Sequence, residues 1–189
     1  MAEQTDDPDR AAERRASLHR AADAGAARLA EREAISSAIG STDAGLLDRI
    51  QALGFDGESA RVLDLLPLVH VCWADGRVQR GERDAVLQIL ERRGLGSGSQ
   101  PRLFIEALLE RRPSESFLGQ ALALVKDLAA RRPGVPADLV DLSARVAEAS
   151  GGLLGIGTRT SDAERALIRT IADALGPEAV ERYRVRFGG

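Results

Sequence analysis

The stretch that decides the fold is LLPLVHVCWADGRVQRGERDAVLQIL, residues 65–90. It starts with an apolar run, passes a glycine turn and continues with apolar residues at helical spacing. A helix that is apolar on every face is buried, whereas one with a single apolar stripe lies at a surface. Gly76 allows the turn because glycine adopts a positive φ at little cost. The stretch predicts a helix-turn-helix unit whose first helix, residues 58–74, is central and is kinked by Pro67.

The flanking sequence carries more helical patterns and no sustained alternation of apolar and polar residues. Aromatic residues make up 3% of the chain, so aliphatic side chains must fill the core. We therefore expect an all-α fold, a compact bundle of about seven helices. Outside the first helix of the central unit, the helical patterns cover residues 43–53, 82–94, 100–112, 115–132, 136–150, 161–176 and 177–187.

Two segments, residues 71–90 and residues 146–172, resemble each other. In each, an apolar helix ends in Ala-Asp-Gly or Ala-Ser-Gly, and the chain continues through an arginine and a Glu-Arg pair into a second helical pattern. We expect two pseudo-duplicated helix-turn-helix units that pack together. The alternative is a chance similarity between two helical hairpins. The corresponding positions are Glu82 with Glu164 and Asp75 with Ser150.

Residues 1–42 differ in composition from residues 43–189, which we expect to form the helical domain. The N-terminal segment has a helix-forming composition, but its large apolar residues are too sparse for a full core face. We expect an exposed helix or a partly disordered extension there, with a partner-binding arm as the alternative. The large apolar residues of this segment are Leu18, Leu29, Ile35 and Ile39.

Charge and composition exclude several classes of protein. The formal net charge is -3, so no global basic field favours nucleic acid as a partner. The longest uncharged apolar stretch, residues 65–74, is far short of the ~20 residues of a membrane-spanning helix. The beginning of the chain, MAEQTDDPDR, lacks the apolar region of a signal peptide. Cys72 is the only cysteine and is expected to pack as a small apolar residue, which suits a cytoplasmic protein.

The central turn matches the second half of the calcium-binding loop of EF-hand proteins. In that alignment Asp75 takes the third ligand position, and Glu82 takes the position of the bidentate glutamate. The first two ligand positions are Val71 and Trp73, which have no side-chain oxygen. Calcium prefers ~6–8 oxygen ligands, so this loop cannot form a calcium site by itself.

A cation site at this turn would need ligands from elsewhere, and two arginines in the turn also balance its two acids. The predicted metal ligands are Asp75 and Glu82 together with Glu164 of the second turn, for calcium, magnesium or zinc. The alternative is purely structural. Glu82 would stabilise the start of the next helix through the helix dipole, and Ser161 with Glu164 would form an S-x-x-E capping box.

The glycine-rich stretch SGGLLGIG, residues 150–157, has no lysine and no preceding strand, so it does not fit a phosphate-binding loop. It is either a loop that packs on the core or an exposed contact patch for a partner. The residues of that patch would be Leu153, Leu154 and Ile156. The chain has no HExxH, GxSxG, P-loop or CxxC motif, so we expect no catalytic residues and no enzyme.

Three segments of the chain resemble the TerB-like family of tellurite-resistance proteins. They are WADGRVQRGE, RDAVLQIL and the later ASGGLLGIGTRTSDAERALIRTIADALG. They are also similar to the N-terminal domain of DjlA-type co-chaperones, although the J-domain motif His-Pro-Asp is absent from this chain. The resemblance covers about residues 45–176. It implies a compact helical domain built from a duplicated unit, with Asp75 and Glu82 as the acids of the first turn and Glu164 as the acid of the second. Ser150 departs from the pattern, because a second aspartate there would complete the symmetry.

The resemblance also implies a function. It points to a non-enzymatic protein of the tellurite and chemical-stress response that acts as a protein-interaction module and binds a divalent cation. Its partners would be proteins, among them a membrane-associated stress complex. The alternative is a divalent-metal sensor or buffer that uses the acidic helix-turn motifs. An enzyme that uses the same acids for proton transfer is a third alternative, but no substrate pocket is marked in the sequence.

Overall fold

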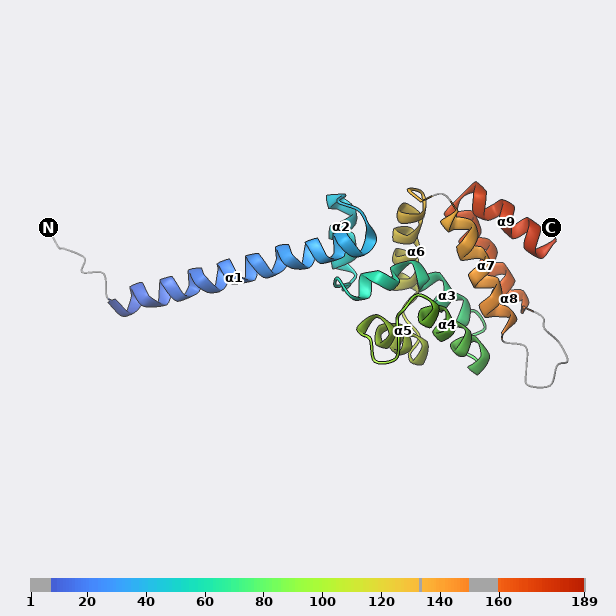
Figure 1. Cartoon of the computed structure of the whole chain (residues 1–189), viewed down its shortest axis with the longest axis horizontal. Helices are drawn as coiled ribbons and strands as arrows, with labels where there is room; N and C mark the ends of the chain where they lie inside the picture. The colour runs from blue at the N-terminus through green and yellow to red at the C-terminus, as the bar shows by residue number, and fades with distance from the viewer. Residues whose placement is uncertain (1–7, 133, 150–159, 189) are drawn as a thin grey trace.

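The computed structural model describes residues 8–132, 134–149 and 160–188, and every regular element within them is a helix (Figure 1). The predicted all-α class is therefore confirmed. The first elements are α1 (Pro8–Ile39), α2 (Ala44–Ala52), the 3-10 helix η1 (Ser59–Leu65), α3 (Leu66–Cys72) and α4 (Arg80–Arg92). The later elements are α5 (Gln100–Glu110), α6 (Glu115–Ala129), α7 (Val135–Glu148), α8 (Asp162–Leu175) and α9 (Pro177–Phe187).

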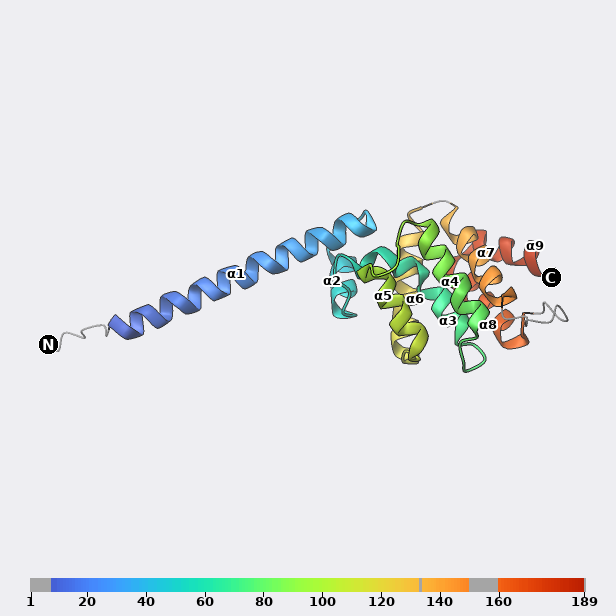
Figure 2. The same cartoon turned by 60° about the horizontal axis from the view of Figure 1, so that its bottom comes forward.

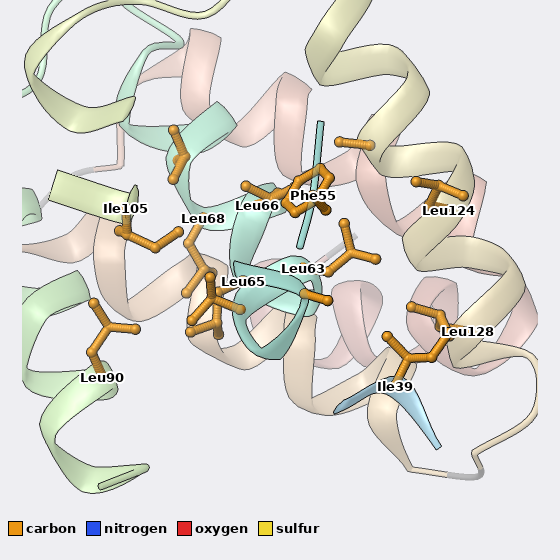
Figure 3. Close-up of a cluster of buried hydrophobic side chains, with 14 of the residues drawn as sticks. Ile39, Phe55, Leu63, Leu65, Leu66, Leu68, Leu90, Ile105, Leu124 and Leu128 are labelled. Carbon is orange, nitrogen blue, oxygen red and sulfur yellow. The ribbon is translucent and has the colours of Figure 1, made fainter. Parts of the chain in front are cut away.

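Helix α3 lies at the centre of the body. All of its residues except His70 are buried. Leu68 packs in a cluster with η1, α4, α5 and α6, while Val71 packs in a second cluster with α7 and α8. Figure 3 shows the leucines of η1 and α3 between Leu90 of α4 and Leu124 of α6. The prediction that the apolar run is the central element is confirmed, because other helices bury every residue of α3 except His70.

The prediction of a single helix over residues 58–74 is wrong in one respect. The chain first forms the 3-10 helix η1 and then begins α3 at Leu66, so that Pro67 falls in the first turn of α3. Proline is tolerated in a first turn because the amide hydrogen that it lacks would have no partner within the helix. Pro67 therefore starts a new helix instead of kinking a continuous one.

Helix α1 projects from the body as a long rod in both views (Figures 1 and 2). Only its last turns join the core, through Ile35 and Ile39, which are 0% and 4% exposed. A Cβ added at Gly57 would lie 2.4 Å from Ala34 Cβ, so this end of α1 packs directly on the backbone before η1. The domain boundary expected after residue 42 stays a prediction, although the base of α1 is part of the body.

The two predicted helix-turn-helix units pack against each other. The first unit is α3 with α4 and the second is α7 with α8, and α7 contacts both helices of the first unit. Gly81 in the first turn of α4 faces the end of α7 so closely that an added Cβ would lie 2.0 Å from the carbonyl oxygen of Ala149. The close contact brings the starts of α4 and α8 to the same region of the body.

No helix among the described residues combines the length and the apolar character that a membrane span requires.

Candidate functional site

The first residue of the candidate site is Glu82, which lies on the first turn of α4. One of its carboxylate oxygens, Oε2, accepts a hydrogen bond from the backbone N–H of Gln79 at 2.7 Å. This bond satisfies an amide that the helix itself leaves without a partner. The Glu82 side chain is nevertheless buried, with 1% of the residue exposed, which is unusual for a glutamate, and no ion pair of Glu82 is found among the described residues.

Glu164 repeats the arrangement on the first turn of α8. Its Oε2 accepts from the backbone N–H of Ser161 at 2.5 Å, and the Ser161 hydroxyl accepts from the N–H of Glu164 at 3.1 Å. The predicted S-x-x-E capping box is confirmed. Glu164 is also 1% exposed, so both turns bury a carboxylate at corresponding positions of the repeat.

The two carboxylates face each other in the interior. Within the described part of the chain, the remaining oxygens, Glu82 Oε1 and Glu164 Oε1, are buried and have no hydrogen-bond partner. Burial raises the pKa of Glu82 to about 8; the bond from the Gln79 N–H opposes this rise, and the neighbouring Glu164 carboxyl adds to it. Two carboxylates only accept hydrogen bonds, so they cannot satisfy each other unless a proton or a cation lies between them.

Asp75 lies near this pair but differs from it in exposure. It belongs to the exposed turn before α4, where Oδ1 accepts from the N–H of Arg77 at 3.3 Å and Oδ2 accepts from Gln79 Nε2 at 3.4 Å. Its negative charge adds to the rise in the pKa of Glu82. Over residues 8–132, 134–149 and 160–188, no three histidine, cysteine, aspartate or glutamate side chains form a group suited to a metal ion.

Cys72 lies next to the carboxylate pair at the end of α3. Burial, and next the charge of Glu82, raise the pKa of its thiol well above the usual value. The thiol therefore stays protonated and does not compete with the carboxylates for a cation. The prediction that Cys72 packs as a small apolar residue is confirmed, since it is fully buried in the core.

The two arginines that balance the acids of the turn in the sequence both lie at the surface. Arg77 is exposed, and the side chain of Arg80 is 94% exposed and lies 3.8 Å from Asp84. Both guanidinium groups point into solvent, where water screens them from the buried carboxylates. The sum of charges along the turn could not reveal this separation, because it depends on which side of the turn each side chain occupies.

Four predicted positions lie outside the described residues. These are Ser150, the counterpart of Asp75, and the partner-contact candidates Leu153, Leu154 and Ile156. The contact patch therefore stays a prediction.

A family model described as Tellurite resistance protein TerB matches residues 65–186. The chain belongs to the TerB family. The match begins at the end of η1 and ends in α9, so the TerB region contains both acidic turns and leaves out α1 and α2. The resemblance seen in the sequence is thus confirmed. No curated protein and no solved structure matches the chain.

Proposed function

We propose that this TerB-family protein is a non-enzymatic component of a cytoplasmic response to tellurite and chemical stress. It binds a divalent cation between Glu82 and Glu164, and it acts on protein partners. The observation that supports the cation site best is the pair of buried Oε1 atoms, which have no hydrogen-bond donor among the residues that the structure describes. A buried acceptor with no donor costs free energy, and a cation bound between two such acceptors removes that cost.

The donor set indicates which cations fit. Carboxylate oxygens are hard ligands, so magnesium and calcium are favoured over zinc, which prefers nitrogen and sulfur. The capping bonds hold each carboxylate at its Oε2 atom and leave Oε1 available as the ligand. Water completes the coordination, and the negative charge of Asp75 in the nearby exposed turn favours a cation at this place.

Titration calorimetry on the full chain tests the cation site. The chelator-treated protein is titrated with magnesium, calcium and zinc, and the same is done for the double variant Glu82→Gln and Glu164→Gln. We expect the wild type to bind a single cation and the double variant to bind none. The control is Glu13→Gln, which removes an exposed carboxylate of α1 and should bind as the wild type does. Equal heats for the wild type and the double variant would rule out the site.

The alternative function is a metal sensor or buffer, in which the cation is the signal. Glu82 lies on the first turn of α4 and Glu164 on the first turn of α8. A cation bound to both would link these two turns, so binding would change how firmly α4 and α8 are held together. A pull-down from tellurite-treated cells, with and without chelator, separates the two functions. Partner capture that needs the cation favours a sensor, whereas capture in the presence of chelator favours an interaction module with a structural ion.

A further inference from the structure

We infer that the projecting part of α1, residues 8–30, is a docking arm for an acidic amphipathic helix of another protein. The inference rests on the proposed function only in taking the protein to act through partners, and it does not need the cation site. The features that carry it are two exposed leucines on one face of a fixed helix and the arginines that lie next to those leucines. Residues 8–30 lie outside the TerB match.

The arm is held rigidly at its base. The Gly57 N–H donates to Glu31 Oε1 at 2.5 Å, and Arg32 Nη2 donates to the carbonyl of Ala44 at 3.0 Å. Ile35 and Ile39 anchor the same end of α1 in the core. At about 1.5 Å per residue, residues 8–30 present roughly 35 Å of helix beyond this anchor. A preformed helix loses little conformational entropy on binding, which favours association.

The docking face is defined by Leu18 and Leu29, which are 70% and 65% exposed. They are separated by about three turns, so they lie on the same side of α1. Ala22 and Gly25 lie between them on that side and would let a second helix approach closely. These four residues, at positions 18, 22, 25 and 29, are separated by four, three and four positions, which is the spacing of the core positions in a coiled coil.

The charges around this face favour an acidic partner. By helical spacing, Arg15 lies one turn before Leu18 at the end of the leucine face and Arg28 lies beside Leu29, while Glu13 and Asp23 lie on the far side of α1. The Nε atoms of the two arginines donate to carbonyls one turn earlier, so both side chains lie along the helix. Residues 8–30 contain five arginines against three acidic residues.

Other occupants fit less well. A second copy would bring together two arms that each carry more arginines than acidic residues, and like charges repel. A membrane surface normally receives aromatic or many large apolar side chains, and the arm has only the two leucines. Nucleic acid would pair with the arginines, but phosphate groups give the leucines between them no apolar contact.

Fluorescence anisotropy tests the docking arm with a designed probe. The probe is a labelled synthetic helix of about four heptads with leucine at the core positions and glutamate beside them. A matched probe carries lysine in place of glutamate. The full chain, in chelator, should bind the glutamate helix and not the lysine helix. The double variant Leu18→Ala and Leu29→Ala should bind at least ~30-fold more weakly, since each leucine buries apolar surface.

Charge reversal provides the sharpest control. The double variant Arg15→Glu and Arg28→Glu should lose the glutamate helix and gain the lysine helix, a swap that a purely structural role of α1 cannot produce. Changing Glu13→Gln and Asp23→Asn on the far side should leave both affinities unchanged. Circular dichroism confirms that each variant keeps its helices.

Three results would overturn the inference. The first is equal affinity of the wild type and the leucine variant for the glutamate helix. The second is a dimer in sedimentation that the leucine variant abolishes, which would assign the face to a second copy. The third is leucine-dependent binding to phosphatidylglycerol vesicles or duplex DNA without binding to the helix probe. Because chelator is present throughout, failure here leaves the cation site unaffected, and a failed cation titration leaves the docking arm unaffected.

Discussion

Helices α3 and α1 are opposite extremes of one molecule. The shorter, α3, is surrounded by other helices, and every residue but His70 is buried. The longer, α1, runs into solvent and exposes Leu18 and Leu29 (Figure 1). The difference shows that a helix in this protein is stabilised in two ways, by burial in α3 and by local composition in α1, where alanine and arginine favour the helix itself. Substitutions should therefore affect stability in α3 and binding in α1.

The largest expected effect is at the centre of α3. Leu68→Ala removes a side chain that is 0% exposed and leaves a cavity that packed neighbours cannot close. We expect a loss of about 3–4 kcal/mol in the free energy of unfolding, measured by urea denaturation. A loss below ~1 kcal/mol would mean that the body is loosely packed around α3.

The next effect is a pH dependence from Glu82, measured with chelator present. The pKa of Glu82 is about 8 in the folded protein and near 4.5 when unfolded, so the folded state holds the proton more tightly. The stabilisation is therefore complete below pH 4.5 and is lost as the pH rises through 8. We expect a fall on the order of 2 kcal/mol between pH 6 and pH 9, less than the full shift implies because relaxation and water entry screen the pair.

Glu82→Gln should remove most of this pH dependence, and the small fall that remains near pH 9 should come from the buried Cys72 thiol, whose pKa is also raised. The glutamine carbonyl can keep the bond from the Gln79 N–H, while its amide can donate to Glu164 without any proton uptake. The pKa values of Asp43 and Asp56 are lowered, the first by Arg131 and the second by Ser59, so these groups titrate below the pH range of the measurement. A Glu13→Gln control should keep the wild-type slope. The same slope in Glu82→Gln would show that another group is responsible.

A smaller effect is expected at the cap of α8. Ser161→Ala removes the hydroxyl that accepts from the N–H of Glu164, at a cost of about 1 kcal/mol. It should also weaken cation binding, because the capping box holds Glu164 in place. Ser114→Ala, which removes the cap of α6, should cost a similar amount and leave cation binding unchanged. Urea denaturation and calorimetry on both variants provide the comparison.

The smallest expected effect on stability is on the arm. Leu18→Ala and Leu29→Ala together should change the free energy of unfolding by less than about 0.5 kcal/mol, because both side chains are already in water. Thermal denaturation of the double variant, compared with Leu68→Ala, measures the contrast directly. A large loss would mean that the arm packs on the body in solution.

Much of the fold was predictable because its signals are local. The apolar run before Gly76 indicated the central helix, and the S-x-x-E pattern indicated the cap at Ser161. The 3-10 helix η1 was missed because the apolar spacing does not distinguish a 3-10 turn from an α turn. The exposure of the Arg80 guanidinium group could not be predicted, because the direction of this side chain depends on how the turn packs.

The sequence by itself determined the helices, the family and the two acidic turns, since helical periodicity, glycine turns and capping residues act over a few neighbouring positions. Only the tertiary structure decided that Glu82 and Glu164 face each other in the interior. Their oxygens meet because α7 of the second helix-turn-helix unit packs against α3 and α4 of the first, with Gly81 against the end of α7. In the same way, only the tertiary packing determined that the end of α1 at Ile35 is buried while the arm is exposed. The burial of a side chain depends on which other helices lie next to it, and the helical pattern of the sequence does not show this.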